Sequence, residues 1–462
     1  MVPKGISIRC FSQTRSAWNL CWPSSQFGPH RVQRSEMLNG IKIAAAKTAG
    51  TPIAACTVMF QAGSRFETND DLGSGHFVRV TTPASGCGYT AFSKTRVLQQ
   101  LGAHLTCTSN RQYIAFTLCC PLPSFKAVKY YLLDTAARSC YNEWDIEDGK
   151  PIVLDDLFRI TPEQRVIDLV QRACWAGPLS NSIYCEEERV DDMSRSTLCS
   201  FVYNNFKSTE CSVASVGVPF DETLKIADKI EITRCKPPER EVCMSQPRGG
   251  FEYYETGSGS DTCIAAVVPG CGASDITLVI ALVDQLVCLF KHAIIAAACG
   301  TGSVQTGQHD LDYTPHGPLG LMSGADVHTR FRAFNISYDD TGVFGILCNT
   351  RAKTAYNSTC ALVEFLCNVG DLDFRQLEIG KKRLKLDLAL HDQEAAPSSE
   401  GLALQLACGV QLDSIHDALA LIDSISVDEL SCTAKCLSSK RHELAIAAVG
   451  DCGAVPQELF SG

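Results

Sequence analysis

The chain has 462 residues, 45% of them hydrophobic, and is long enough for two or more globular domains. Its formal net charge of −10 argues against nucleic acid as the main partner, because binding phosphates requires a basic surface. No run of about 18 residues is both uncharged and strongly apolar. The closest run, 276–290, is interrupted by Asp284, so a transmembrane helix is not expected.

Segment 1–37 has the composition of a mitochondrial transit peptide. It is rich in arginine and serine and contains no acidic residue before Glu36. Import sequences of this kind are basic, serine-rich and poor in acids. We therefore predict a presequence over 1–37, cleaved between Gln33 and Asn39. A disordered basic tail is the alternative.

The first half of the remaining chain, 38–235, mixes strand and helix patterns. Strands are predicted at 41–46, 53–62, 105–110, 113–119 and 212–217, and helices at 93–101, 123–140 and 162–174. This mixture predicts an α+β domain with an antiparallel sheet backed by helices.

A charged, proline-containing segment, 236–250, is predicted to link this half to a second domain, 251–462. The second half has predicted strands at 263–268 and 445–449 and predicted helices at 278–299 and 373–395. Both halves open with a strand and close with a strand that ends at a glycine. We therefore predict a duplicated fold of two homologous domains.

The 25 cysteines are an odd number and form no Cys-x-x-Cys motif. Most of them stand in apolar runs, where a free cysteine behaves as a small buried hydrophobe. We predict mainly reduced core thiols in a reducing compartment. A few bridges or a reactive thiol remain as alternatives.

Segment 73–80, Gly-Ser-Gly-His-Phe-Val-Arg-Val, resembles the His-x-x-Glu-His signature of the zinc metallopeptidases that include the mitochondrial processing peptidase. His76 stands at the first ligand position, but Arg79 replaces the glutamate and Val80 replaces the second histidine. A peptidase zinc site needs two imidazoles and a carboxylate base. One imidazole beside a guanidinium cannot hold zinc, so we predict no catalytic residue, no metal and no cofactor.

Two further segments resemble the same family. Residues 61–67 read Gln-Ala-Gly-Ser-Arg-Phe-Glu, like the segment that precedes the family's signature helix. Residues 335–346, which include Asn-Ile-Ser-Tyr-Asp-Asp-Thr-Gly, resemble a strand pair of the family's second half. The resemblance runs from about residue 38 to the C-terminus. It is strongest to the non-catalytic core subunits of mitochondrial ubiquinol–cytochrome c reductase, respiratory complex III.

The resemblance implies a structural role. A core subunit lies on the matrix side of the inner mitochondrial membrane as a peripheral protein. It supports the assembly and stability of the electron-transferring subunits without holding a redox group. The implied partners are core protein 1, cytochrome b, cytochrome c1 and the iron–sulfur protein, with no nucleic acid.

Two other functions are weighed against this one. The non-catalytic α subunit of the processing peptidase also lacks the zinc motif, but it carries a long glycine-rich loop, and loop 300–307 is shorter and different. A working peptidase is opposed by Arg79 and Val80. The family's third zinc ligand is expected about 80 residues after the motif, and segment 155–160 contains no glutamate.

Overall fold

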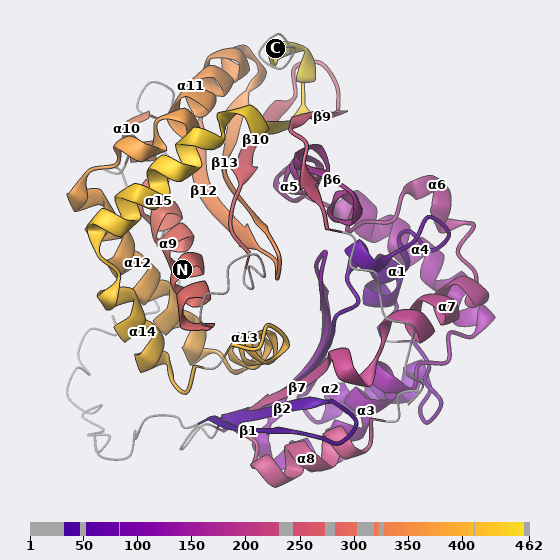
Figure 1. Ribbon diagram of the computed structural model, residues 1–462. Helices are drawn as coiled ribbons and strands as arrows, with labels where there is room; N and C mark the ends of the chain where they lie inside the picture. Colours follow the sequence, from indigo (N-terminus) through magenta and orange to yellow (C-terminus); the bar gives the residue numbers. More distant parts are fainter. Residues whose placement is uncertain are drawn as a thin grey trace, which may run out of the picture.

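The computed structural model describes residues 32–46, 52–82, 84–230, 244–272, 282–302, 318–322, 328–410 and 412–456. Two lobes, one from each half of the chain, lie side by side in Figure 1, and each is built on its own six-stranded sheet. Residues 1–31, 236–243 and 303–307 lie outside the described ranges. The presequence, the linker and the difference between loop 300–307 and the glycine-rich loop of the processing-peptidase α subunit therefore stay predictions.

The first sheet has the strand order β1-β2-β7-β3-β5-β4. Strands β2 and β7 are parallel, and the other neighbours are antiparallel. The strands are β1 (Val32–Glu36), β2 (Lys42–Ala46), β3 (Ile53–Phe60), β4 (His104–Ser109), β5 (Ile114–Pro121) and β7 (Cys211–Val216).

The helices of this lobe connect and cover its strands. They are α1 (Ser74–Val80), α2 (Ala91–Gln100), α3 (Phe125–Ala137), α4 (Glu143–Arg159), α5 (Pro162–Cys174), α6 (Glu187–Val190), α7 (Arg195–Asn205) and α8 (Phe220–Asp228). A short pair, β6 (Trp175–Ala176) with β8 (Gln246–Pro247), lies near the junction of the lobes.

The second sheet has the order β11-β12-β13-β10-β14-β9. Its strands are β9 (Gly250–Glu255), β10 (Asp261–Pro269), β11 (Thr301–Gly302), β12 (Arg330–Ser337), β13 (Gly342–Arg351) and β14 (Ala445–Gly450). Its helices are α9 (Leu282–Cys299), α10 (Pro318–Met322), α11 (Ala355–Cys367), α12 (Phe374–Gln393), α13 (Ala395–Ala407), α14 (Ile415–Ser424) and α15 (Val427–Ser439).

The two lobes share one topology. Read from β9, the second sheet runs β9-β14-β10-β13-β12, which matches β2-β7-β3-β5-β4 of the first sheet strand for strand. The parallel pair β2–β7 has its counterpart in the parallel pair β9–β14. The predicted α+β class with two homologous domains is therefore confirmed. In this correspondence α9 follows β10 as α1 follows β3.

Each lobe lends one helix to the sheet of the other (Figure 1). Helix α5 packs against β10 and β14 of the second sheet, with Val166 and Val170 completely buried. Helix α13 packs on β2, β3 and β7 of the first sheet through Leu402, Ala403 and Leu406. Full burial of a valine or leucine side chain contributes about 1.5–3 kcal/mol. The exchanged helices therefore hold the lobes together.

A turn of the second lobe also binds the first lobe. The guanidinium of Arg65 donates to both carboxylate oxygens of Asp340 at 2.9 and 2.8 Å. Gln61 and Tyr113 donate to the neighbouring Asp339 at 2.8 and 2.5 Å. Bidentate pairs of this kind fix orientation as well as adding energy. The turn 338–342 is thus a second junction between the lobes.

Several elements of the structure were not predicted from the sequence, among them helices α4, α7, α8, α11, α13, α14 and α15. Strand β1 pairs with β2 and begins at Val32, upstream of the expected start of the folded body at Leu38. Helix α4 was not predicted, because Gly149 and Pro151 in its sequence favour a helix break. The structure accommodates both residues inside the helix, and Gly149 sits at its contact with α1.

No disulfide joins the cysteines of the described ranges, and many of these cysteines are buried. Burial raises the pKa of the Cys56 and Cys174 thiols to about 12, which keeps them protonated and unreactive. At the surface, the sulfur atoms of Cys87 and Cys140 lie 2.7 Å apart. The expected reduced state of the thiols remains a prediction.

Candidate functional site

Helix α1, which carries the altered motif, is held at its N-terminus by Glu67. The buried carboxylate accepts the backbone N–H groups of Gly73 at 2.8 Å and Gly75 at 2.7 Å. Burial raises the pKa of Glu67 to about 8, although these two hydrogen bonds oppose the shift. A Cβ atom on Gly75 would lie 3.0 Å from the carboxylate, so a side chain there would disturb this cap. The family-like segment 61–67 therefore sets the start of the helix.

His76 is buried and both of its ring nitrogens are engaged. Nδ1 accepts the backbone N–H of Cys185 at 3.1 Å, and Nε2 lies 2.8 Å from Oδ2 of Asp156. Because Nδ1 is an acceptor, the ring proton is on Nε2 and is donated to Asp156. Burial lowers the pKa of His76 to about 4, helped by the charge of Arg79 and opposed by Asp156. The ring is therefore neutral near pH 7.

Arg79 pairs with the same carboxylate oxygen. Its Nη2 lies 2.7 Å from Oδ2 of Asp156. One oxygen thus receives hydrogen bonds from both His76 and Arg79, and it joins α1 to α4. The guanidinium supplies the positive charge that a bound cation would otherwise supply to these groups.

Asp156 corrects an expectation from the sequence. Segment 155–160 was expected to supply no third ligand because it contains no glutamate. In the structure, Asp156 reaches His76 because α4 approaches α1 at Gly149, where a Cβ atom would lie 2.7 Å from the side chain of Thr81. A carboxylate is therefore present, but it is paired with Arg79.

The residues present do not fit a zinc ion. Val80 has no ligand atom and packs against the hydrophobic core of the first lobe. A neutral histidine that binds zinc through Nε2 carries its proton on Nδ1. Here the backbone N–H of Cys185 points at Nδ1, so two donors would face each other. The charge of Arg79 adds electrostatic repulsion. His76, Arg79 and Val80 thus lie close together without forming a metal site. In this cluster, His76 and Arg79 are hydrogen-bonded to Asp156, and Val80 packs against the core.

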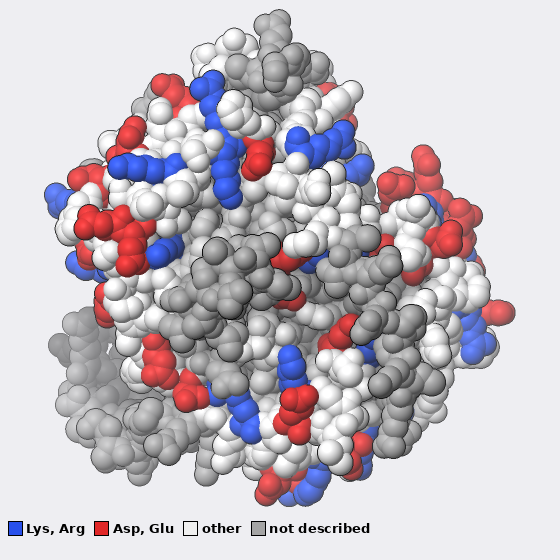
Figure 2. All heavy atoms as spheres, in the orientation of Figure 1, with Lys and Arg blue, Asp and Glu red and all other residues white. Residues whose placement is uncertain are grey.

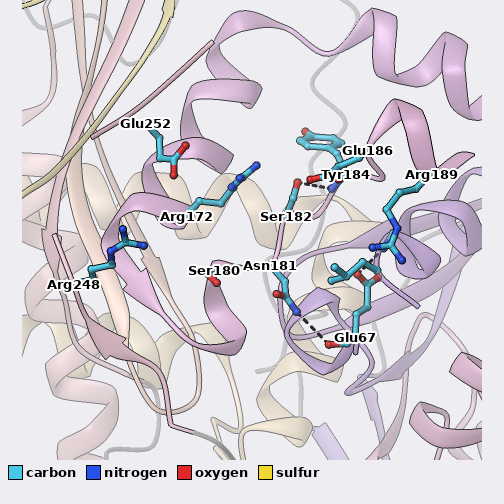
Figure 3. A pocket seen from close by; sticks show the side chains of 12 residues that line it. Glu67, Arg172, Ser180, Asn181, Ser182, Tyr184, Glu186, Arg189, Arg248 and Glu252 are labelled. Carbon is cyan, nitrogen blue, oxygen red and sulfur yellow. Dashed lines mark hydrogen bonds between the residues drawn. The ribbon is translucent and has the colours of Figure 1, made fainter. Parts of the chain in front are cut away.

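A polar pocket of about 250 Å³ lies beside this cluster (Figure 3). Its charged lining side chains are Glu67, Arg172, Glu186, Arg189, Arg248 and Glu252. Tyr184 separates the pocket from the cluster, since its ring meets His76 edge-on at 5.7 Å. The lining includes Glu252 from β9, so both lobes contribute. The sequence did not predict this pocket, and no histidine or cysteine is among the residues that line it.

The surface carries both signs of charge. Figure 2 shows lysine and arginine side chains interspersed with acidic ones over most of the visible face. Acidic side chains gather at the edge where α6 lies, and exposed acidic residues there are Glu186, Glu187, Glu188, Asp191 and Asp192. None of the helices in the described ranges combines the length and apolar character needed to cross a bilayer.

Lowering the pH should weaken the fold through His76. Its pKa is about 4 in the folded chain and about 6.5 when unfolded. The unfolded state therefore gains a proton between these values while the folded state does not. The contribution of neutral His76 to the unfolding free energy is complete above about pH 6.5. Lowering the pH to about 4 reduces the unfolding free energy by about 3 kcal/mol.

Comparing the urea unfolding of the wild type with that of a His76→Gln variant isolates this contribution, because the two proteins share every titratable group except His76. The unfolding free energy of the variant minus that of the wild type should increase by about 3 kcal/mol when the pH is lowered from 7 to 4. A difference that stays constant with pH would show that His76 is already solvated or charged in the folded chain.

Comparison with known proteins shows which families and proteins this chain resembles. The sequence profile of insulinase, peptidase family M16, matches residues 42–187. Human cytochrome b-c1 complex subunit 2, mitochondrial, is 23% identical over 93% of this chain and 91% of its own length. The mitochondrial-processing peptidase subunit alpha of Solanum tuberosum is 21% identical over 93% of this chain and 84% of its own.

Among solved structures, a chain of complex III2 from Candida albicans, with Inz-5 bound, superposes with a TM-score of 0.75. The match covers 91% of this chain and 96% of that one at 14% identity, which establishes a shared fold. The chain is therefore similar over nearly its whole length to cytochrome b-c1 complex subunit 2 and to the processing-peptidase subunit alpha, and its residues 42–187 match the M16 peptidase profile.

Proposed function

We propose that the chain is a non-catalytic core subunit of the mitochondrial cytochrome b-c1 complex, respiratory complex III. The observation that carries the proposal is the similarity to cytochrome b-c1 complex subunit 2 over 93% of this chain. The Arg79–Asp156 ion pair, at 2.7 Å, supports the non-catalytic part of the proposal, because it stands where a peptidase of this fold needs its base and metal. The chain then acts as a scaffold. It is peripheral on the matrix side of the inner membrane and supports the assembly and stability of the electron-transferring subunits.

The proposed partners follow from this role. They are core protein 1, cytochrome b, cytochrome c1 and the iron–sulfur protein. The experiment is native gel separation of gently solubilised mitochondrial membranes, followed by mass spectrometry for this chain. Migration with cytochrome b and cytochrome c1 in one large assembly is expected.

A second function is favoured by the similarity to the potato processing-peptidase subunit, which covers as much of this chain. As a non-catalytic α subunit, the chain would migrate as a soluble heterodimer of about 100 kDa, twice its own mass of 50.1 kDa. Finding the chain only in such a heterodimer would overturn the scaffold proposal.

Restoring the missing residues of the zinc motif should not restore peptidase activity. The double variant Arg79→Glu/Val80→His should bind no more zinc per chain than the wild type does and should not cleave a presequence peptide, although Asp156 lies nearby. The Cys185 N–H still faces Nδ1 of His76, and the introduced glutamate would stand beside Asp156 without the charge of the guanidinium. Equilibrium dialysis with zinc and a cleavage assay with and without chelator measure both effects. Chelator-sensitive cleavage would contradict this account.

A further inference from the structure

Helix α9 of the second lobe carries two metal-ligating side chains on one face. Cys288 and His292 are four residues apart, so one helical turn places them next to each other. The helix also carries Asp284, Gln285 and Lys291 in an otherwise apolar sequence, and His292 is only 5% exposed. A carbonyl oxygen can only accept a hydrogen bond, so the 3.0 Å contact between Nδ1 of His292 and the carbonyl of Cys288 puts the ring proton on Nδ1. The same Nδ1 atom lies 4.0 Å from the sulfur of Cys288, so this nitrogen is the one beside the thiol, and it can bind a metal once the ring proton is on Nε2.

A third ligand comes from another element. Cys271 lies two residues beyond the end of β10, and one ligand atom each from Cys271, Cys288 and His292 lie within 4.8 Å of one another. Tetrahedral zinc with bonds of about 2.0–2.3 Å places its ligand atoms roughly 3.5–3.8 Å apart. A small side-chain movement therefore brings the three groups onto one ion.

We infer that Cys271, Cys288 and His292 form a binding site for one soft divalent cation of the zinc class. Two sulfur atoms and one imidazole nitrogen are the donors that select such ions over magnesium or calcium. The site is separate from the His76 cluster, which lies in the first lobe.

The position of Cys271 gives the ion a structural consequence. Segment 270–272 packs closely on the turn 338–342: Gly270 donates its N–H to the carbonyl of Gly342 at 2.6 Å. A Cβ atom on Gly272 would lie 2.4 Å from the carbonyl carbon of Asp340, so only glycine allows this approach. Asp340 is the partner of Arg65 in the first lobe. A cation at Cys271 would therefore anchor α9 to the segment that supports this junction between the lobes.

The corresponding place in the first lobe is α1, which follows β3 as α9 follows β10. The altered peptidase motif has its two ligand positions, 76 and 80, four residues apart on that helix. Cys288 and His292 repeat this spacing on α9 with donors that can bind metal. The inferred site is thus on the equivalent helix of the other lobe, where the peptidase motif itself is not found.

The test is a titration of the full chain, purified under reducing conditions, with cobalt(II) and then zinc. One cobalt per chain should bind, with the thiolate-to-cobalt charge-transfer band of a tetrahedral sulfur site, and zinc should displace it. Cys288→Ser and His292→Ala should weaken binding by more than about 100-fold, beyond the loss caused by an outer-shell change.

Matched controls separate this site from adventitious binding. Cys432→Ser removes an exposed cysteine from α15, and His76→Ala removes the buried histidine of the first lobe; neither should change the stoichiometry. X-ray absorption of the zinc-loaded wild type should show two sulfur ligands and one nitrogen ligand. This measurement uses the wild type alone, so its result does not depend on whether a variant folds. Cobalt bound without a thiolate band, or a first shell of nitrogen and oxygen only, would overturn the inference. Neither result bears on the proposed scaffold function.

Discussion

An Arg111→Met variant should lose about 3–5 kcal/mol of unfolding free energy, because it leaves a buried carboxylate without its cation. Arg111 is 1% exposed. Its guanidinium donates to Oδ1 and to the carbonyl of Asp168 at 2.7 and 3.0 Å, and to the carbonyl of Leu179 at 3.0 Å. Asp168 belongs to α5, the helix that covers the second sheet. The pair therefore ties that helix to its own lobe.

Urea unfolding followed by circular dichroism measures the loss. Arg159→Met is the matched control, because Arg159 pairs with Asp155 at 2.9 Å but both side chains are more than half exposed. That change should stay within about 0.5 kcal/mol. The double variant Arg111→Met/Asp168→Asn should recover part of the loss, since the unpaired charge is gone. A loss below about 1 kcal/mol in the single variant would mean that Asp168 is reached by water or protonated.

An Ala403→Glu variant should destabilise the chain by about 4 kcal/mol or more, because it inserts a carboxylate between α13 and the first sheet. Ala403 is completely buried and belongs to the cluster that contains Ala44, Met59 and Ala214. Its carbonyl also accepts a hydrogen bond from Ser212 of β7 at 3.0 Å. The added side chain has no room and no partner in this interface.

The same helix provides the control two residues earlier. Gly401 is exposed, and a Cβ atom there meets nothing within 4 Å, so Gly401→Glu adds the same charge on the outer face. Its effect should be within about 0.5 kcal/mol and can be favourable, because glutamate prefers a helix over glycine. Limited proteolysis should cut near α13 in Ala403→Glu alone. Equal stability of the two variants would show that α13 does not cover the first sheet in solution.

Local patterns predicted most of the elements that make up the two sheets. Helix α5 begins at Pro162 and ends at Cys174 as its apolar spacing predicts, since a capping box at Thr161 and a proline at the first helical position define its start. Strand β10 follows from its continuous apolar run, which is typical of a strand buried on both faces. Helix α4 was missed because tertiary packing at Gly149 outweighs the low helix propensity of its sequence.

The candidate site was predicted in part. His76, Arg79 and Val80 stand within one turn of a helix, so their departure from the motif is visible in the sequence. Asp156 comes from α4, and only the close approach of the two helices makes it the common partner of His76 and Arg79. Periodicity likewise shows that α5 has an apolar face, whereas α13 was not predicted at all. Periodicity does not tell which sheet the face of α5 covers, because that depends on contacts between distant parts of the chain.

The exchange of α5 and α13 has a consequence for how the chain reaches its native state. Synthesis proceeds from the N-terminus, so the first sheet is complete once β7 has been made, long before α13 at Ala395–Ala407 is available to cover it. An apolar sheet face left open during that interval is prone to aggregation. A newly made first lobe therefore exposes this apolar face until α13 has been synthesised. It reaches its final stability only after most of the second lobe has also been made.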